Sequence, residues 1–317
     1  MRRRSRPPKA VRLAVRAGAV AIVGSAIALP LVRRRLRIPG PVTLAVAASG
    51  PLAVAVLAPR SRKRDVALFA MQMWAFTVVH EMPYDDPEAL RRRLYTRYPI
   101  KVDSLIGGGR LPGKRLQTAL ADRRGVAALD HFLTVAHWLW FFEPYVVLSW
   151  ILVRHPENFP RAARQMAAVF DAGALGYWAL PTAPPWWSSE QGYTKEPMRR
   201  IMLEVGEPLW GRLWGPLYKA LGGNPWAAMP SLHFATSVQG AVSLSESSRR
   251  EGAVAWAYAA TLGFGLVYLG EHYVTDLLAG AGLVGAVRGA DPVFAPAVGR
   301  VSGVIQRLER IAGGASR

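Results

Sequence analysis

Two short segments that contain histidine hold the residue types best suited to chemistry. They are residues 229–233, Met-Pro-Ser-Leu-His, and residues 270–276, Gly-Glu-His-Tyr-Val-Thr-Asp. His272 and Asp276 are four residues apart, a spacing that places two side chains on one face of a helix. A carboxylate there would accept the imidazole N–H, fix the tautomer and raise the basicity of the ring. The other ring nitrogen of His272 would then be free as a nucleophile, with His233 as the proton donor.

The apolar segments between these histidines predict that the two meet in space. His233 begins the apolar run 232–248, the run 252–270 returns, and His272 begins the run 272–290. As helices, the first two runs would each rise about 26 to 28 Å, enough for one membrane crossing. Two crossings return the chain to its starting side. We therefore expect His233 and His272 to lie at one membrane face.

Composition and charge place the chain among membrane proteins. Hydrophobic residues make up 51% of the 317 residues and charged residues 19%, with no cysteine to supply disulfides or thiolate ligands. The formal charge is +19, but the basic residues gather at 2–16, 33–37 and 60–64, beside the apolar runs 17–32 and 42–58. Such clusters are typical of topology signals and of contacts with anionic lipid. We therefore expect a membrane partner and no nucleic acid.

The order of apolar segments predicts an all-α, multi-pass helical bundle. Candidate spans are 13–32, 42–58, 66–82, 131–153, 162–181, 232–248, 252–270 and 272–290. Gly50-Pro51 leaves a re-entrant segment as an alternative for 42–58. The polar residues Gln72 and His80 leave open whether 66–82 spans the membrane. No cleavage motif follows the first run, which predicts an uncleaved membrane hairpin.

Four segments are expected along the chain. They are a basic N-terminus with membrane segments (1–65), a further membrane segment with a long polar connection (66–130), a catalytic membrane core (131–290) and a basic tail (291–317). Within the core, the tryptophan-rich connection 182–230 is expected at the membrane surface. The aromatic run 138–142 is interpreted as belt and packing, and His137 as an interfacial residue. The charge of short loops and termini favours the cell membrane, with the histidine face extracytoplasmic.

The two motifs together, in this order and at this spacing, resemble the type 2 phosphatidic acid phosphatase superfamily over residues 131–290. Pro-Ser-Leu-His, in place of Pro-Ser-Gly-His, is more similar to the inositol phosphorylceramide synthase branch. The resemblance implies a six-helix core and catalysis without metal or cofactor. It implies that His272 attacks the phosphorus of a lipid phosphate to give a phosphohistidine, that Asp276 orients His272, and that His233 protonates the leaving group. Water would then complete hydrolysis, or an alcohol such as a polyol head group would complete transfer.

The sequence departs from that family where phosphate should be bound. No Lys-x6-Arg-Pro motif is present, and Gly265-Leu266 stands where the phosphatases carry a Ser-Arg pair. The proline-rich segment 181–187 carries tryptophan where a cation would be expected. A phosphate in the transition state still needs positive charge. We expect Lys195, Arg199 and Arg200 to supply this charge, and we favour the two arginines over the lysine. Lys195 and Arg199 are expected to share one helical face. Ser231 is the further phosphate-binding candidate.

Several alternatives stay open from the sequence. Water as the acceptor would make the protein a lipid phosphate or polyprenyl diphosphate phosphatase. His233, His272 and Asp276 could instead form a facial metal triad, or the two histidines could only cap helices. The missing arginines also leave room for a non-catalytic scaffold or transporter that keeps the fold.

Overall fold

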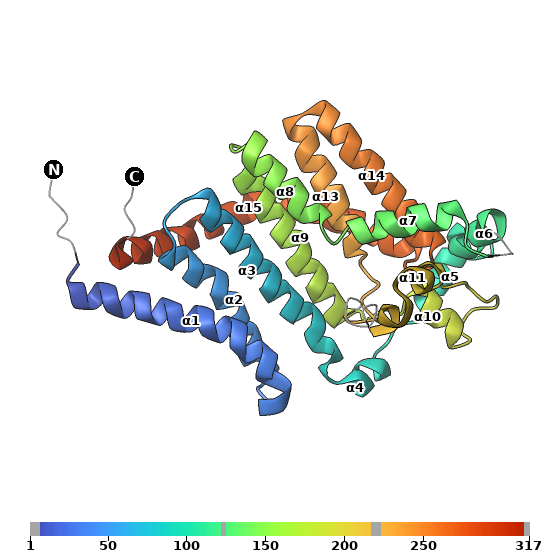
Figure 1. Ribbon diagram of the computed structural model, residues 1–317, viewed down its shortest axis with the longest axis horizontal. Coiled ribbons are helices and arrows are strands. Elements are labelled where there is room, and N and C mark those ends of the chain that lie inside the picture. Colours follow the sequence, from blue (N-terminus) through green and yellow to red (C-terminus); the bar gives the residue numbers. More distant parts are fainter. Residues whose placement is uncertain (1–6, 122–124, 217–222, 314–317) are drawn as a thin grey trace. The chain divides into compact units, whose positions relative to one another are not determined.

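The computed structural model describes residues 7–121, 125–216 and 223–313 (Figure 1). Throughout these residues the regular structure is helical, and β-structure is limited to isolated bridges such as Thr182 with Ala227. The prediction of an all-α fold is confirmed. The chain divides into two compact units, one formed by Met1–Asp85 with Gly289–Arg317 and the other by Asp86–Arg288. These units differ in their boundaries from the segments expected from the sequence.

The first unit is built on apolar helices from both ends of the chain. Its helices are α1 (Lys9–Leu36), α2 (Gly40–Leu57), α3 (Arg62–Glu81), η1 (Met82–Asp85) and the second half of α15 (Val274–Ala312). Small side chains, Ala19, Ala53 and Ala312, meet in its core, which allows close helix packing. α2 runs continuously through Pro51, so it is a helix and not a re-entrant loop. The residues expected to form a basic tail continue α15 as far as Ala312.

The second unit holds the long α13–α14 hairpin and the helices around it. Its elements are α4 (Pro87–Arg92), α5 (Arg97–Ile106), α6 (Pro112–Leu120), α7 (Ala128–Leu139), α8 (Glu143–Arg154), α9 (Phe159–Ala179), α10 (Pro185–Glu190), α11 (Ile201–Trp210), η2 (Gly211–Leu213), α13 (Leu232–Ser247), α14 (Arg249–Tyr268) and the start of α15. α13 packs against α8 and α9, and α14 packs against α6 and α7 (Figure 1). The two long connections of the sequence therefore contain short helices that surround the bundle.

The α13–α14 hairpin is fixed by its turn and by glycine contacts. Ser248 ends α13 and also caps α14, where its hydroxyl accepts the N–H of Glu251. At the other end of α13, Leu232 packs into the space left by Gly173 of α9, where a Cβ would lie 2.4 Å from the leucine side chain. This packing sets the position of the first turn of α13, which carries His233.

The expected span 131–153 is not one straight helix, because the chain bends sharply within it. α7 ends at Leu139, α8 begins at Glu143, and the two helices are bent by 56°. Pro144 occupies the first turn of α8, a position that suits proline because it has no N–H to donate to a preceding turn. Residues 140–142 form the break.

By length and composition, three helices of the described residues are apolar enough to cross a membrane. These are α1, α2 and α15, and the bent pair α7–α8 would make a fourth. The other predicted spans form helices but carry more polar side chains. In α13, for example, Gln239 donates to Gln165 of α9 at 3.2 Å and to Ser243 at 2.9 Å. These polar groups are buried between helices, where protein partners replace water.

Replacing Gly280 by Ala should destabilise the protein, whereas the same change at Gly282 should not. A Cβ on Gly280 would lie 2.7 Å from the backbone oxygen of Ser231, so the backbone would have to move. Overpacking of this kind costs about 1 to 3 kcal/mol. A Cβ on Gly282 meets nothing within 4 Å, and Ala is the better helix former. Thermal unfolding in detergent, followed by circular dichroism, measures the difference, and equal midpoints would contradict the packing of α15 on α13.

Candidate active site

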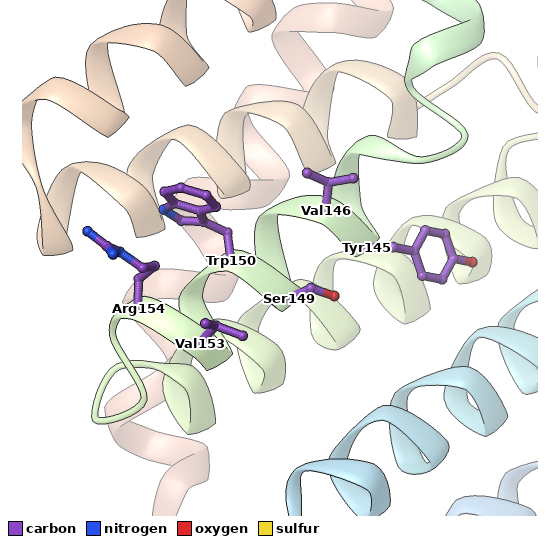
Figure 2. A pocket seen from close by; sticks show the side chains of 6 residues that line it. All are labelled: Tyr145, Val146, Ser149, Trp150, Val153 and Arg154. Atoms are coloured by element: carbon purple, nitrogen blue, oxygen red, sulfur yellow. The ribbon is translucent and has the colours of Figure 1, made fainter.

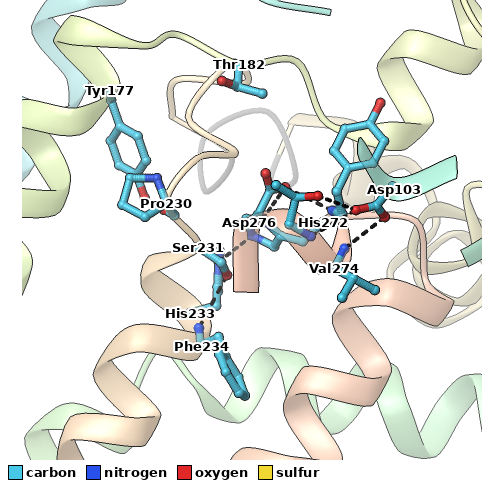
Figure 3. A network of polar contacts seen from close by, with 12 residues as sticks. Asp103, Tyr177, Thr182, Pro230, Ser231, His233, Phe234, His272, Val274 and Asp276 are labelled. Atoms are coloured by element: carbon cyan, nitrogen blue, oxygen red, sulfur yellow. Dashed lines mark hydrogen bonds and ion pairs between the residues drawn. The ribbon is translucent and has the colours of Figure 1, made fainter. Parts of the chain in front are cut away.

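His233, His272 and Asp276 form one continuous chain of contacts (Figure 3). Nδ1 of His272 lies 3.3 Å from Oδ2 of Asp276, and Nε2 of His272 lies 3.2 Å from Nδ1 of His233. Asp276 is fully buried and His272 is 5% exposed. The structure thus brings together the three residues that the sequence placed at one face. Their catalytic roles remain predictions.

The His272–Asp276 contact is made at a helix cap. His272 lies just before α15, and Asp276 sits in its first turn, so the two do not share a helical face as expected. Oδ2 of Asp276 also accepts the backbone N–H of Tyr273 at 2.9 Å. Before His272 the chain turns sharply at Gly270, whose φ of 81° favours glycine. Asp276 therefore caps the helix and holds the imidazole with the same oxygen.

Ser231 ties the start of α13 to the start of α15. Its backbone N–H donates to the carbonyl oxygen of Asp276 at 3.0 Å. Its hydroxyl caps α13 by accepting the N–H of Phe234 at 3.3 Å. Tyr177 of α9 donates to the carbonyl of Pro230 at 3.0 Å and holds the preceding residue (Figure 3). Ser231 is fully buried and positions His233, and its expected contact with phosphate remains a prediction.

Asp103, from α5, is a residue of the site that sequence reasoning missed. Its carboxylate accepts the N–H groups of Val274 and Thr275, both at 2.9 Å, and the hydroxyl of Thr275 at 2.6 Å (Figure 3). The side chain is buried, with 1% exposed. A carboxylate suits the positive end of α15 and satisfies N–H groups that the helix cannot. Nothing near Asp103 in the sequence indicates this, because its partners are more than 170 residues away.

Two aromatic rings lie against His233. The ring centroid of Trp140 is 4.1 Å from that of His233, and the centroid of His137 is 4.7 Å away. His137 is buried within the protein, and its expected place at the membrane interface stays a prediction. Trp140 was expected to serve only in a belt and in packing, and its contact with a site histidine was missed.

The three candidate cations have different surroundings. Arg199 pairs with Glu204, and this hydrogen bond raises the pKa of the guanidinium. Arg200 lies with its guanidinium carbon 3.6 Å from the ring centroid of Trp186 and pairs with Glu190 at 3.4 Å. The backbone N–H of Trp186 donates to the carbonyl of Gly270 at 3.0 Å. Arg200 is thus linked through one residue to the loop that carries His272. Lys195 is exposed.

The expectation that Lys195 and Arg199 share a helical face is wrong. Residues 191–200 form no helix, since Gly192 has a φ of 76° and Pro197 interrupts backbone hydrogen bonding. In the described part of the chain, no group of three or more His, Asp or Glu side chains is placed to hold a metal ion.

One pocket lies away from these residues, along a single face of α8 (Figure 2). Its volume is about 430 Å³, and its lining residues are Tyr145, Val146, Ser149, Trp150, Val153 and Arg154. Arg154 lies over the ring of Trp150, with 5.7 Å between the guanidinium carbon and the ring centroid. None of the triad residues lines this pocket. The candidate active site is therefore located by the contacts among His233, His272 and Asp276, and not by a cavity.

The fold is that of an all-α protein with helices apolar enough to cross a membrane, and it holds a His–His–Asp contact chain. The sequence profile described as the PAP2 superfamily matches residues 116–290, more than half of the chain. The protein therefore belongs to the PAP2 superfamily, whose members are generally metal-independent phosphatases. The match runs from within α6 into α15 and includes the whole triad. Comparison with curated proteins and with solved structures gives no match.

Asp103→Ala should lower the free energy of unfolding by about 2 kcal/mol or more, since it leaves buried N–H groups of α15 without an acceptor. Asp86→Ala is the matched control, because exposed Asp86 caps α4 through one bond to Ala89 at 2.9 Å. Its expected cost is no more than about 1 kcal/mol. Denaturant titration of the purified variants measures both. An equal loss for the two would show that Asp103 is only an ordinary cap.

Proposed function

We propose that this protein is a membrane lipid phosphotransferase that acts through a phosphohistidine, similar to inositol phosphorylceramide synthase. The observation that carries the proposal is the contact chain from Asp276 through His272 to His233, at 3.3 and 3.2 Å. Membership of the PAP2 superfamily supports a phosphatase or phosphotransferase type of activity. The substrates we propose are a lipid phosphate drawn from the bilayer and a polyol acceptor.

In the first half-reaction, Asp276 accepts the Nδ1–H of His272, which leaves the lone pair on Nε2. Nε2 attacks phosphorus, a P–N bond forms, and the P–O bond to the lipid alcohol breaks. The leaving oxygen takes a proton from His233, whose Nδ1 lies 3.2 Å from the attacking nitrogen. The burial of Asp276 keeps water from competing for its contact with the imidazole.

In the second half-reaction, an acceptor hydroxyl attacks the phosphohistidine. His233 takes the proton of that hydroxyl and returns to its starting form, while the P–N bond breaks and His272 is restored. With a polyol as acceptor the product is a lipid-free polyol phosphate, and with water it is free phosphate. A lipid phosphate or polyprenyl diphosphate phosphatase is therefore the second candidate, favoured by the usual activity of the superfamily.

We place the site at the extracytoplasmic face of the cell membrane. The basic clusters at 2–16 and 60–64 flank α1 and α2, in the arrangement that short cytoplasmic segments commonly show. His233 and His272 both lie at the opposite end of the α13–α14 hairpin from its turn at Ser248. This orientation is testable by labelling cysteines introduced at single positions.

The deciding experiment follows phosphate from a radiolabelled lipid, with a chelator present. Purified wild type should become labelled and should release phosphate or, with inositol added, form a lipid-free inositol phosphate. His272→Ala should take up no label. Asp276→Asn should retain a low rate, reduced by about 10²- to 10⁴-fold, because the imidazole loses its orienting acceptor.

The outcomes separate the candidate functions. A product that contains the alcohol supports transfer, and phosphate release that is insensitive to the alcohol supports the phosphatase. Equal turnover by wild type and His272→Ala would contradict the phosphohistidine. Lipid binding without labelling or turnover across lipid and polyprenyl phosphates would favour a non-catalytic scaffold or transporter.

Arg200→Ala should raise the KM for the lipid phosphate by about tenfold or more, as expected when one charge-assisted hydrogen bond is lost. Arg199→Ala should change the KM by less than about threefold, because Glu204 already holds that guanidinium through two hydrogen bonds, whereas Glu190 contacts Arg200 through one longer bond at 3.4 Å. Lys195→Ala serves as the exposed control. Steady-state kinetics of the three variants measures these effects. A larger rise for Arg199→Ala than for Arg200→Ala would reverse the assignment.

A further inference from the structure

We propose that Trp140, together with the neutral ring of His137, fixes the imidazole of His233 and stabilises its protonated form. Both are positioning residues that act through the general acid. The inference rests on the proposed function, in which His233 donates a proton to the leaving group. It assigns a role to the break between α7 and α8, which the reaction otherwise leaves unused.

The indole of Trp140 is close to His233 and is itself held in place. The two ring centroids are 4.1 Å apart, with an angle of 48° between the planes. Nε1 of Trp140 donates to the hydroxyl of Thr236 at 2.8 Å, and that hydroxyl donates to the carbonyl of Leu232 at 2.7 Å. The indole is thus bonded to the same turn of α13 that carries His233. A ring locked in this way can hold the imidazole without moving itself.

His137 supplies a second ring. Its centroid lies 4.7 Å from that of His233, with 60° between the planes. Nδ1 of His137 lies 2.8 Å from Sδ of Met202, and a thioether only accepts, so Nδ1 carries the proton. Nε2 is buried without a hydrogen-bond partner, which leaves the ring neutral. A neutral neighbour does not repel a proton on His233, as a second charged imidazole would.

Aromatic faces attract a cation, and indole does so most strongly. The titratable groups around His233 come from several elements. They are His137 of α7, Glu143 of α8, which lies against Gly240 two turns along α13, and His272 and Asp276 near the start of α15. Replacing Trp140 by Leu changes none of these charges. Any change in the protonation of His233 would therefore report the loss of the ring.

The end of α7 also provides a matched control. Trp138 is half-buried like Trp140, but it packs on Trp214 and Trp210, at 5.2 and 6.5 Å between centroids. Trp138→Leu removes the same side chain two residues away, from contacts that do not include His233. Trp140→Phe keeps one aromatic ring but loses the indole N–H and the five-membered ring, so it serves if Trp140→Leu folds poorly.

The experiment measures the titration midpoint of His233 by NMR of histidine-labelled protein in detergent, with His233→Gln used for assignment. Trp140→Leu should lower the midpoint by roughly 0.4 to 1.5 pH units relative to Trp138→Leu. Trp140→Phe should fall between Trp140→Leu and wild type, and His137→Leu should lower the midpoint by less than Trp140→Leu. The alkaline limb of kcat against pH should move in the same direction as the midpoint.

An equal midpoint in Trp140→Leu and Trp138→Leu would overturn the inference. A rise in the midpoint of Trp140→Leu would also overturn it. The NMR result does not need turnover, so it decides the role of Trp140 even if wild type acts on none of the lipid phosphates. A wild type that acts on none of the lipid phosphates would count against the proposed function alone.

Discussion

The hydrogen bond from the Ser231 backbone to the Asp276 carbonyl, at 3.0 Å, is the contact on which the arrangement of the site depends. It joins the start of α13 to the start of α15, two helix ends that are separated along the chain by a complete hairpin. Because backbone atoms make it, the position of either histidine follows from the path of the chain. The close approach requires Gly280, where a Cβ would meet the same serine residue.

Two carboxylates accept the backbone N–H groups at the start of α15. Asp276 uses one oxygen both to cap the helix and to hold His272, and Asp103 satisfies the next N–H groups from outside the helix. The two acids therefore contact different groups of one turn. A helix end that is satisfied in this way is rigid, and rigidity is what a nucleophile needs to stay oriented before substrate arrives.

The buried polar groups farther along the bundle follow the same physical rule. The buried Gln165 and Gln239 and the half-buried Arg288 are linked by hydrogen bonds between α9, α13 and α15. Arg288 also pairs with Glu246 near the end of α13. Polar groups removed from water need partners, and the partners here are on neighbouring helices. The polar composition of α13 thus reflects packing inside the protein, which explains why this helix is less apolar than α1 or α2.

The sequence by itself determined the helical class and the proximity of His233 and His272. Helix rise is a fixed property of the backbone, so two apolar runs of known length return the chain to one face. The His272–Asp276 pair also follows from sequence, since residues this close can meet in a helix or in a cap. What only the tertiary structure decided are the contacts of Asp103, Trp140 and Arg200. Those depend on where the break after α7 and the short helices pack, and local sequence does not encode packing between distant segments.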